Sequence, residues 1–289
     1  MMSTEKNRLV IKGTLLTHPL SFKVGEEIFS SQLLSVMNSW YSYTYNNFGE
    51  PIRELTVLQL REYGKIKLAL NGYTNDLHNI TINYCLFREI IDDRNIGFHR
   101  SNLYLALLIE NIFINLRSIY DFFYHFIKIC LSDFQLKQYP DKDSINNVIN
   151  YSKKINNLEK LPFEIVKFLE YISPDLEDIK IIRDNIIHKG KDIMLTRESD
   201  RLLMRIPIKD LYTKDNLLPN ILETEDLNYD VLMYIDKIIK TTFTNMEILA
   251  EVLFHEVHQY ENFRHQPYAI TNYCIDDFND FLILGCRMQ

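Results

Sequence analysis

The chain has 289 residues and a formal net charge of −7; 46% of its residues are hydrophobic and 25% are charged. The hydrophobic and charged fractions are those of a globular protein with a large core, and they exclude a disordered chain. The negative net charge excludes a basic protein that coats nucleic acid non-specifically. Gly and Pro number 8 each, under 3% apiece, which predicts long uninterrupted elements and a mainly α-helical fold.

The first part of the chain, residues 1–50, is predicted to be an N-terminal segment with short strands. Residues 8–16 and 20–24 are rich in β-branched and apolar side chains and flank a His-Pro turn, as in two short strands. A helix around Leu33 is expected to follow them.

Two long helices are predicted next, at the start of a helical domain over residues 51–265. The first runs from about 53 to 92, with Asn71-Gly72 as a potential break. After a turn at 95–97, the second covers 101–131 and forms the centre of the bundle. Its charged residues favour a buried core helix over a membrane span.

The remaining elements are shorter and are separated by clear turn signals. A Ser-Pro pair, Ser173-Pro174, resembles the N-cap and first helical position of a new helix. The elements expected after residue 140 are a helix from 144 to 155, a helix from 162 to 172, a helix from 173 to 190, a β-hairpin over 192–208, a helix from 226 to 261, and a short helix at 271–286 within a C-terminal tail over 266–289.

The amino terminus and the cysteines indicate the compartment. The first residues are polar and lead into no apolar signal core. Four cysteines, at positions 85, 130, 274 and 286, show no C-x-x-C pairing and are expected to be free thiols. We therefore expect a cytoplasmic protein that does not associate with a membrane.

The residue order at 182–190, Ile-Arg-Asp-Asn-Ile-Ile-His-Lys-Gly, indicates chemistry as well as packing. Apolar residues recur at helical spacing up to Ile187, and Gly190 fits the left-handed position after a last helical turn. Arg183 falls within this apolar arc, where a guanidinium needs a carboxylate or a phosphate. By α-helical spacing, Asp184, Asn185 and His188 share a different, polar and exposed face.

This R-D-x-x-x-H segment resembles the R-x-x-x-x-H motif of the HEPN superfamily (higher eukaryotes and prokaryotes nucleotide-binding domains), with Arg183, Asp184 and His188 in the three places. Upstream, residues 115–121 (Asn-Leu-Arg-Ser-Ile-Tyr-Asp) resemble the L-R-x-x-x-D element of an earlier HEPN helix. The resemblance covers roughly residues 100–190, and it implies a HEPN-like helical bundle with a short N-terminal β segment and a β-hairpin after the motif helix. Some members carry a tyrosine soon after the histidine, whereas Lys189 and Gly190 follow here.

The resemblance implies a metal-independent endoribonuclease in which Arg183, Asp184 and His188 are catalytic. Histidine titrates near neutral pH and would accept the proton of an RNA 2′-hydroxyl, while arginine would stabilise charge on the phosphoryl oxygens. Asp184 would orient the histidine or the 2′-hydroxyl. No metal or cofactor is required, because the nucleophile belongs to the RNA, and DNA would not be a substrate.

Dimerisation is expected from the spacing of the motif. On one α-helix Arg183 and His188 lie about 140° apart, so a single copy makes a poor site. HEPN ribonucleases bring two copies together across a two-fold axis, and we therefore expect a homodimer. The family also implies a toxin–antitoxin or antiphage setting, with an antitoxin protein as a potential partner.

Residues around the motif are expected to support it. Residues 180–209 contain eight basic and four acidic side chains, a charge of +4 that leaves −11 for the rest of the chain. Asn185, Lys189 and Lys191 are the expected RNA-binding residues. On the 101–131 helix a polar stripe lies within about 80°; its members are Glu110, Arg117, Asp121, His125 and Lys128.

Several alternatives remain open on sequence alone. The polar stripe is either a solvated face or the lining of a cleft in which Asp121 or Glu110 is the counter-ion of Arg183. The acidic net charge favours a non-catalytic HEPN module that binds RNA, a nucleotide or a protein partner. His255 and His258 lie three apart, not four as in zinc proteases, so helix-surface histidines are favoured over a metal site completed by His265.

Overall fold

The computed structural model describes most of the chain between residues 28 and 258. The described residues are 28–29, 32–44, 56–93, 95–154, 160–190, 192–198, 201–207, 216–225, 227–258, 263, 270–271 and 278. The predicted strands at 8–16 and 20–24, residue Lys191 and most of the C-terminal tail lie outside this set.

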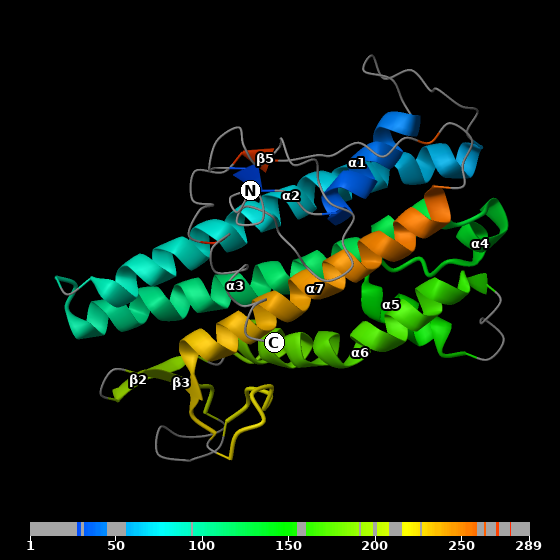
Figure 1. The fold of residues 1–289 in the computed structure, drawn as a ribbon. Coiled ribbons are helices and arrows are strands. Elements are labelled where there is room, and N and C mark those ends of the chain that lie inside the picture. The colour runs from blue at the N-terminus through cyan, green and yellow to red at the C-terminus, as the bar shows by residue number, and fades with distance from the viewer. Residues whose placement is uncertain are drawn as a thin grey trace, which may run out of the picture. The chain divides into compact units, whose positions relative to one another are not determined.

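The protein is mainly α-helical, as its composition predicts, with a small antiparallel sheet after the motif helix (Figure 1). The described elements are β1 (Ile28–Phe29), α1 (Gln32–Thr44), α2 (Val57–Asp92), α3 (Phe98–Phe126), the 3-10 turn η2 (Ile127–Cys130), α4 (Asp133–Gln138), α5 (Ile145–Ser152), α6 (Phe163–Arg183), the π turn η4 (Asp184–His188), β2 (Met194–Glu198), β3 (Arg201–Arg205), β4 (Tyr229–Asp230), α7 (Val231–Val257) and β5 (Ile270–Thr271).

Helix α2 does not break at Asn71-Gly72. The glycine is needed for packing, because a Cβ placed on Gly72 would lie 2.6 Å from Cζ of Phe122 on α3. The ring of Phe122 also meets Tyr73 edge-on, with 6.5 Å between ring centroids. Gly72 therefore allows a close contact between two helices, and the surrounding apolar burial overrides its low helix propensity.

The prediction that Ser173-Pro174 starts a new helix is wrong. Helix α6 runs unbroken from Phe163 to Arg183 with Pro174 inside it. A proline within a helix removes one backbone hydrogen bond and costs about 3 kcal/mol. The side chains that compensate lie on both sides of it, since Leu169, Ile172, Leu176 and Ile179 are each at most 2% exposed. Tertiary packing thus outweighs the local signal.

The predicted hairpin is confirmed and belongs to a three-stranded antiparallel sheet. β2 pairs with β3 from Met194 opposite Arg205 to Glu198 opposite Arg201. β4 then pairs with β3, with Leu203 opposite Asp230. The sequence did not predict β4, because two residues are too few to show alternation. A second sheet joins β1 to β5.

The chain forms two compact units, and four helices contribute residues to both. The first unit comprises residues 1–75, 119–173 and 243–289, and the second comprises 76–118 and 174–242. The boundaries fall inside α2, α3, α6 and α7 rather than between blocks of sequence. The predicted division into an N-terminal segment, a helical domain and a tail stays a prediction.

Two buried charged side chains in the first unit, Lys128 and Glu247, have polar partners. Lys128, predicted as part of a polar stripe, has a side chain only 4% exposed, and its Nζ lies 2.6 Å from Oε2 of Glu62. The Lys128 ammonium also lies 4.3 Å from the centroid of the Tyr124 ring. Glu247, which is 1% exposed, accepts the backbone N–H of Gln32 at 3.1 and 3.0 Å. A carboxyl group of α7 thus caps the first turn of α1.

In the second unit, hydrogen bonds tie the helices to each other and to the sheet. Asn79 on α2 donates to Asn115 on α3 at 3.4 Å. Asn102 on α3 donates to the Leu195 carbonyl of β2, also at 3.4 Å. The Tyr234 hydroxyl on α7 donates to the Pro219 carbonyl at 2.9 Å, which fixes the loop before β4.

One helical stretch among the described residues, Phe98–Cys130, is long and apolar enough to cross a membrane by composition alone. Half of the most apolar part of this stretch is buried inside the protein. Apolar side chains including Phe113, Leu116 and Phe123 are fully buried. These features are those of a buried core helix, as predicted for this segment.

The close contact at Gly72 gives a test of the packing between α2 and α3. We expect Gly72→Ala to lower the free energy of unfolding by about 1 kcal/mol or more, because the Phe122 ring must move. Gly64→Ala, on the same helix with nothing within 4 Å, should raise it by about 0.5–1 kcal/mol. Denaturant titration of both variants measures the difference, and equal effects would contradict the proposed role of Gly72.

Burial of Glu247 predicts a pH dependence of stability. Burial, with a small contribution from Glu251, raises the pKa of Glu247 from 4.5 to about 8, although the Gln32 N–H opposes the shift. The folded protein therefore holds a proton that the unfolded chain releases. This stabilisation is fully present below pH 4.5 and is lost as pH rises to about 8. Denaturant titrations from pH 5 to 9 should show a smaller fall in stability for Glu247→Gln than for the wild type; parallel curves would contradict it.

Candidate functional site

The motif helix ends in a π turn rather than in an α-helical turn. Helix α6 ends at Arg183, and Asp184–His188 form η4, in which the Lys189 N–H donates to the Asp184 carbonyl at 3.2 Å. This bond joins residues five apart instead of four. Gly190 follows with φ of 58°, so the predicted left-handed stop is confirmed.

The π turn changes the angle between Arg183 and His188 around the helix axis. In a wider turn, residues five apart lie closer to alignment along the helix than the roughly 140° expected for an α-helix. The backbone of His188 is therefore about one turn from Arg183, and the expected homodimer stays a prediction. The side chain of His188 lies outside the described part of the structure.

Arg183 is not buried, contrary to prediction. Its side chain is 36% exposed, and its Nη1 lies 3.8 Å from Oδ1 of Asp184, whose side chain is also 36% exposed. Because Arg183 is the last residue of α6, its long side chain reaches solvent past the end of the apolar face. Among the described residues, Arg183 forms no ion pair with Glu110. Asp121 belongs to the other unit, so that pairing stays a prediction.

Asn185 is also placed differently from expectation. It was predicted on an exposed polar face, but it is 3% exposed. Asn185 lies in the π turn, where the backbone does not follow α-helical spacing. The buried amide is hydrogen-bonded, since its Oδ1 accepts from the Nζ of Lys189 at 3.0 Å. Asn185 thus contacts exposed Lys189, and its role in RNA binding stays a prediction.

The supporting residues in the second unit lie on α3. Burial and the nearby Asp192 carboxylate raise the pKa of Glu110, while a hydrogen bond with the Ile193 backbone lowers it. Glu110 is therefore close to the link between the motif and β2. Arg117 is 5% exposed, so of the two alternatives for the polar stripe a solvated face does not hold for this residue. Lysine 191, a predicted RNA-binding residue, lies outside the described residues.

The basic segment continues into the hairpin. Arg197 on β2 is exposed, and Arg201 on β3 is 65% exposed in its side chain and pairs with Asp230 at 3.3 Å. Lys189, at the end of the motif, is exposed as well. Cationic side chains thus follow the π turn along the chain, as the local charge of +4 predicts.

The histidines of α7 form no metal site in the part of the chain described. The rings of His255 and His258 lie 5.4 Å apart between centroids. Within that part, no group of three His, Cys, Asp or Glu side chains is close enough to hold a metal ion. His265, the third residue considered, lies outside it.

Comparison of the chain with family models, with curated proteins and with solved structures found no match. The likeness to HEPN proteins therefore depends on the motif residues themselves.

The exposure of Arg183 predicts a small effect on stability. We expect Arg183→Ala to change the free energy of unfolding by less than about 1 kcal/mol, because a half-exposed pair at 3.8 Å is screened by solvent. Arg117→Ala, on α3 of the same unit, removes a buried side chain and should cost about 2–5 kcal/mol. Thermal or urea unfolding of both variants makes the comparison, and a large loss for Arg183→Ala would mean that Arg183 is a structural residue.

Proposed function

We propose that this protein is a metal-independent endoribonuclease of the HEPN type, with its site at the end of α6. One observation carries the proposal. Arg183 and Asp184 lie side by side, half-exposed, at the start of a π turn that also contains His188. Single π turns are rare and occur frequently at functional sites.

Arg183 is suited to bind a phosphate. Its contact with Asp184 is long, and an exposed pair of this kind contributes little to stability, so the guanidinium can exchange the carboxylate for a phosphate at low cost. A guanidinium binds phosphate oxygens with two parallel hydrogen bonds and keeps its charge at all relevant pH values. In the proposed reaction it stabilises the charge that develops on the phosphoryl oxygens.

His188 is the proposed general base. It would take the proton of the 2′-hydroxyl that attacks the neighbouring phosphate, and it would act near neutral pH. Asp184 would orient either the histidine or that hydroxyl. The wider turn favours Arg183 and His188 acting within one copy, although a two-fold dimer of HEPN type remains part of the proposal.

The basic segment after the motif would hold the RNA backbone. Lys189 and Arg197 are exposed, and residues 180–209 have a charge of +4 in a chain of −7. Phosphate contacts of this kind depend on salt, because each releases condensed counterions. The proposed cellular setting is a cytoplasmic toxin–antitoxin or antiphage system, as the resemblance implies.

The test is cleavage of total RNA and of tRNA by purified protein in the presence of EDTA. We expect products that end in 2′,3′-cyclic phosphate and no cleavage of DNA. Arg183→Ala and His188→Ala should each reduce the rate at least about 100-fold, the usual scale for losing an acid–base group or an oxyanion partner.

Matched controls are Arg61→Ala and His258→Ala, which remove an exposed arginine and an exposed histidine of the first unit. Both should cleave at the wild-type rate. Full activity in His188→Ala, or a requirement for magnesium, would place the chemistry elsewhere. RNA binding that depends on Arg183 without any cleavage would favour the non-catalytic module instead.

A further inference from the structure

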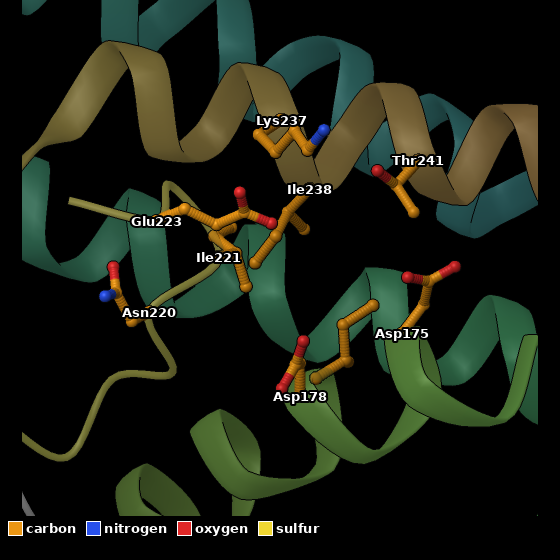
Figure 2. A pocket seen from close by; sticks show the side chains of 9 residues that line it. Asp175, Asp178, Asn220, Ile221, Glu223, Lys237, Ile238 and Thr241 are labelled. Atoms are coloured by element: carbon orange, nitrogen blue, oxygen red, sulfur yellow. The ribbon is translucent and has the colours of Figure 1, made fainter.

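A pocket of about 270 Å³ lies in the second unit, away from the residues of the motif. Figure 2 shows it between α6 and α7, with the loop that carries Asn220, Ile221 and Glu223 at one side. The volume lies just below the usual range for small-molecule sites, which starts at about 300 Å³, and is far larger than one water molecule requires. The pocket is therefore of a size for a small organic ligand.

The lining of the pocket is mainly polar, with a smaller apolar part. The apolar residues that line it are Ile221 and two buried helix residues, Ile179 and Ile238, which are 2% and 4% exposed. Three carboxylates, Asp175, Asp178 and Glu223, lie around it, with Lys237 as the cation among the residues that line it. With all four groups ionised, the lining has a charge of −2, so it favours a cation with a hydrocarbon part.

The carboxylates come from a helix and from a hydrogen-bonded loop. Asp175 and Asp178 lie one turn apart on α6. Glu223 has a left-handed φ of 54°, and Asn220 holds its loop by donating to the Thr224 carbonyl at 2.9 Å and accepting the Thr224 N–H at 3.1 Å. The acidic groups are thus distributed over two segments instead of converging on one point.

This distribution of carboxylates favours an extended organic cation over a metal ion as the ligand. Within the described part of the chain, no three acidic, histidine or cysteine side chains are close enough to bind one metal ion. Of the described residues, none forms an ion pair with Lys237 within 4.0 Å, so Lys237 does not neutralise the nearby carboxylates by direct contact. Burial, with repulsion from Asp175 and Glu177, raises the pKa of Asp178, as expected where negative charge is in excess.

We propose that this pocket binds a linear aliphatic diamine or polyamine in its ammonium form. One ammonium group would pair with Asp178 and the other with Glu223, and the methylene chain would contact Ile221. Charge-assisted hydrogen bonds to carboxylates are the strong polar contacts available to such a ligand. Binding there is independent of RNA cleavage and goes beyond the proposed function.

Calorimetric titration of the full chain with 1,4-diaminobutane tests the proposal. We expect saturable one-to-one binding that Asp178→Asn and Glu223→Gln each weaken about tenfold, the scale of one charge-assisted hydrogen bond. Lys237→Met should tighten binding, because it removes the opposing charge from the pocket. Glu177→Gln is the matched control: this exposed neighbour pairs with Lys180 outside the pocket, and its loss should leave the affinity within about twofold.

Comparator ligands show how many ammonium groups the pocket recognises. 1,4-Butanediol should not bind, and butylamine should bind at least about tenfold more weakly, because it carries one ammonium group instead of two. Equal binding of butylamine would indicate a single ammonium group, as on a lysine side chain, and would overturn the diamine assignment. The diamine should have clearly different affinities for Glu177→Gln and for the two pocket variants, Asp178→Asn and Glu223→Gln. If the three affinities are equal, or if equimolar MgCl₂ displaces the diamine, the binding is non-specific attraction to an acidic protein and the proposal is wrong.

Discussion

Burial of apolar side chains along four long helices is the interaction on which the rest of this structure depends. Helices α2, α3, α6 and α7 contribute most of the fully buried residues, and this burial keeps α2 continuous at Gly72 and α6 continuous at Pro174. The gain from apolar burial, about 25 cal/mol per Å², is large enough to override local helix propensities. One buried cation in this core, Lys128, is paired with Glu62.

The end of α6 shows what happens where this apolar constraint stops. Up to Ile182 the helix is held by its buried face, and from Asp184 the backbone widens into a π turn before Gly190 ends it. Within this stretch Asn185 is buried, while Arg183 is partly exposed. The polar residues that indicate chemistry are therefore grouped at a helix end, and the guanidinium there is held loosely enough to exchange its partner.

Much of the fold could be predicted from the sequence, because apolar periodicity reports burial directly. The long helices, the helix at Gln32–Thr44 and the hairpin of β2 and β3 follow from it. Other features have no local signal. A pair such as Ser173-Pro174 has the same sequence at the start of a helix and inside one. A π turn has hydrogen bonds between residues five apart, whereas an α turn has them between residues four apart. The exposure of Arg183 could not be predicted for that reason.

The diamine pocket lay beyond prediction for a different reason. Asp178, Glu223 and Lys237 come from three segments far apart in the chain, and no spacing within any of them indicates a site. The motif at Arg183 could be found because its residues are neighbours. Sequence reading thus locates sites built on one helix, whereas sites assembled by the tertiary fold require the structure.

The most direct test of the proposed RNA cleavage concerns its nucleophile, the 2′-hydroxyl of the RNA. Once a cleavage position in an RNA substrate has been mapped, one 2′-hydroxyl, on the nucleotide immediately 5′ of the cut, is replaced by hydrogen. The proposed chemistry at Arg183 and His188 predicts that this substrate stays intact while its other positions remain cleavable. Cleavage at the substituted position at the original rate would contradict attack by the RNA itself, and with it the assignment of this protein as a metal-independent endoribonuclease.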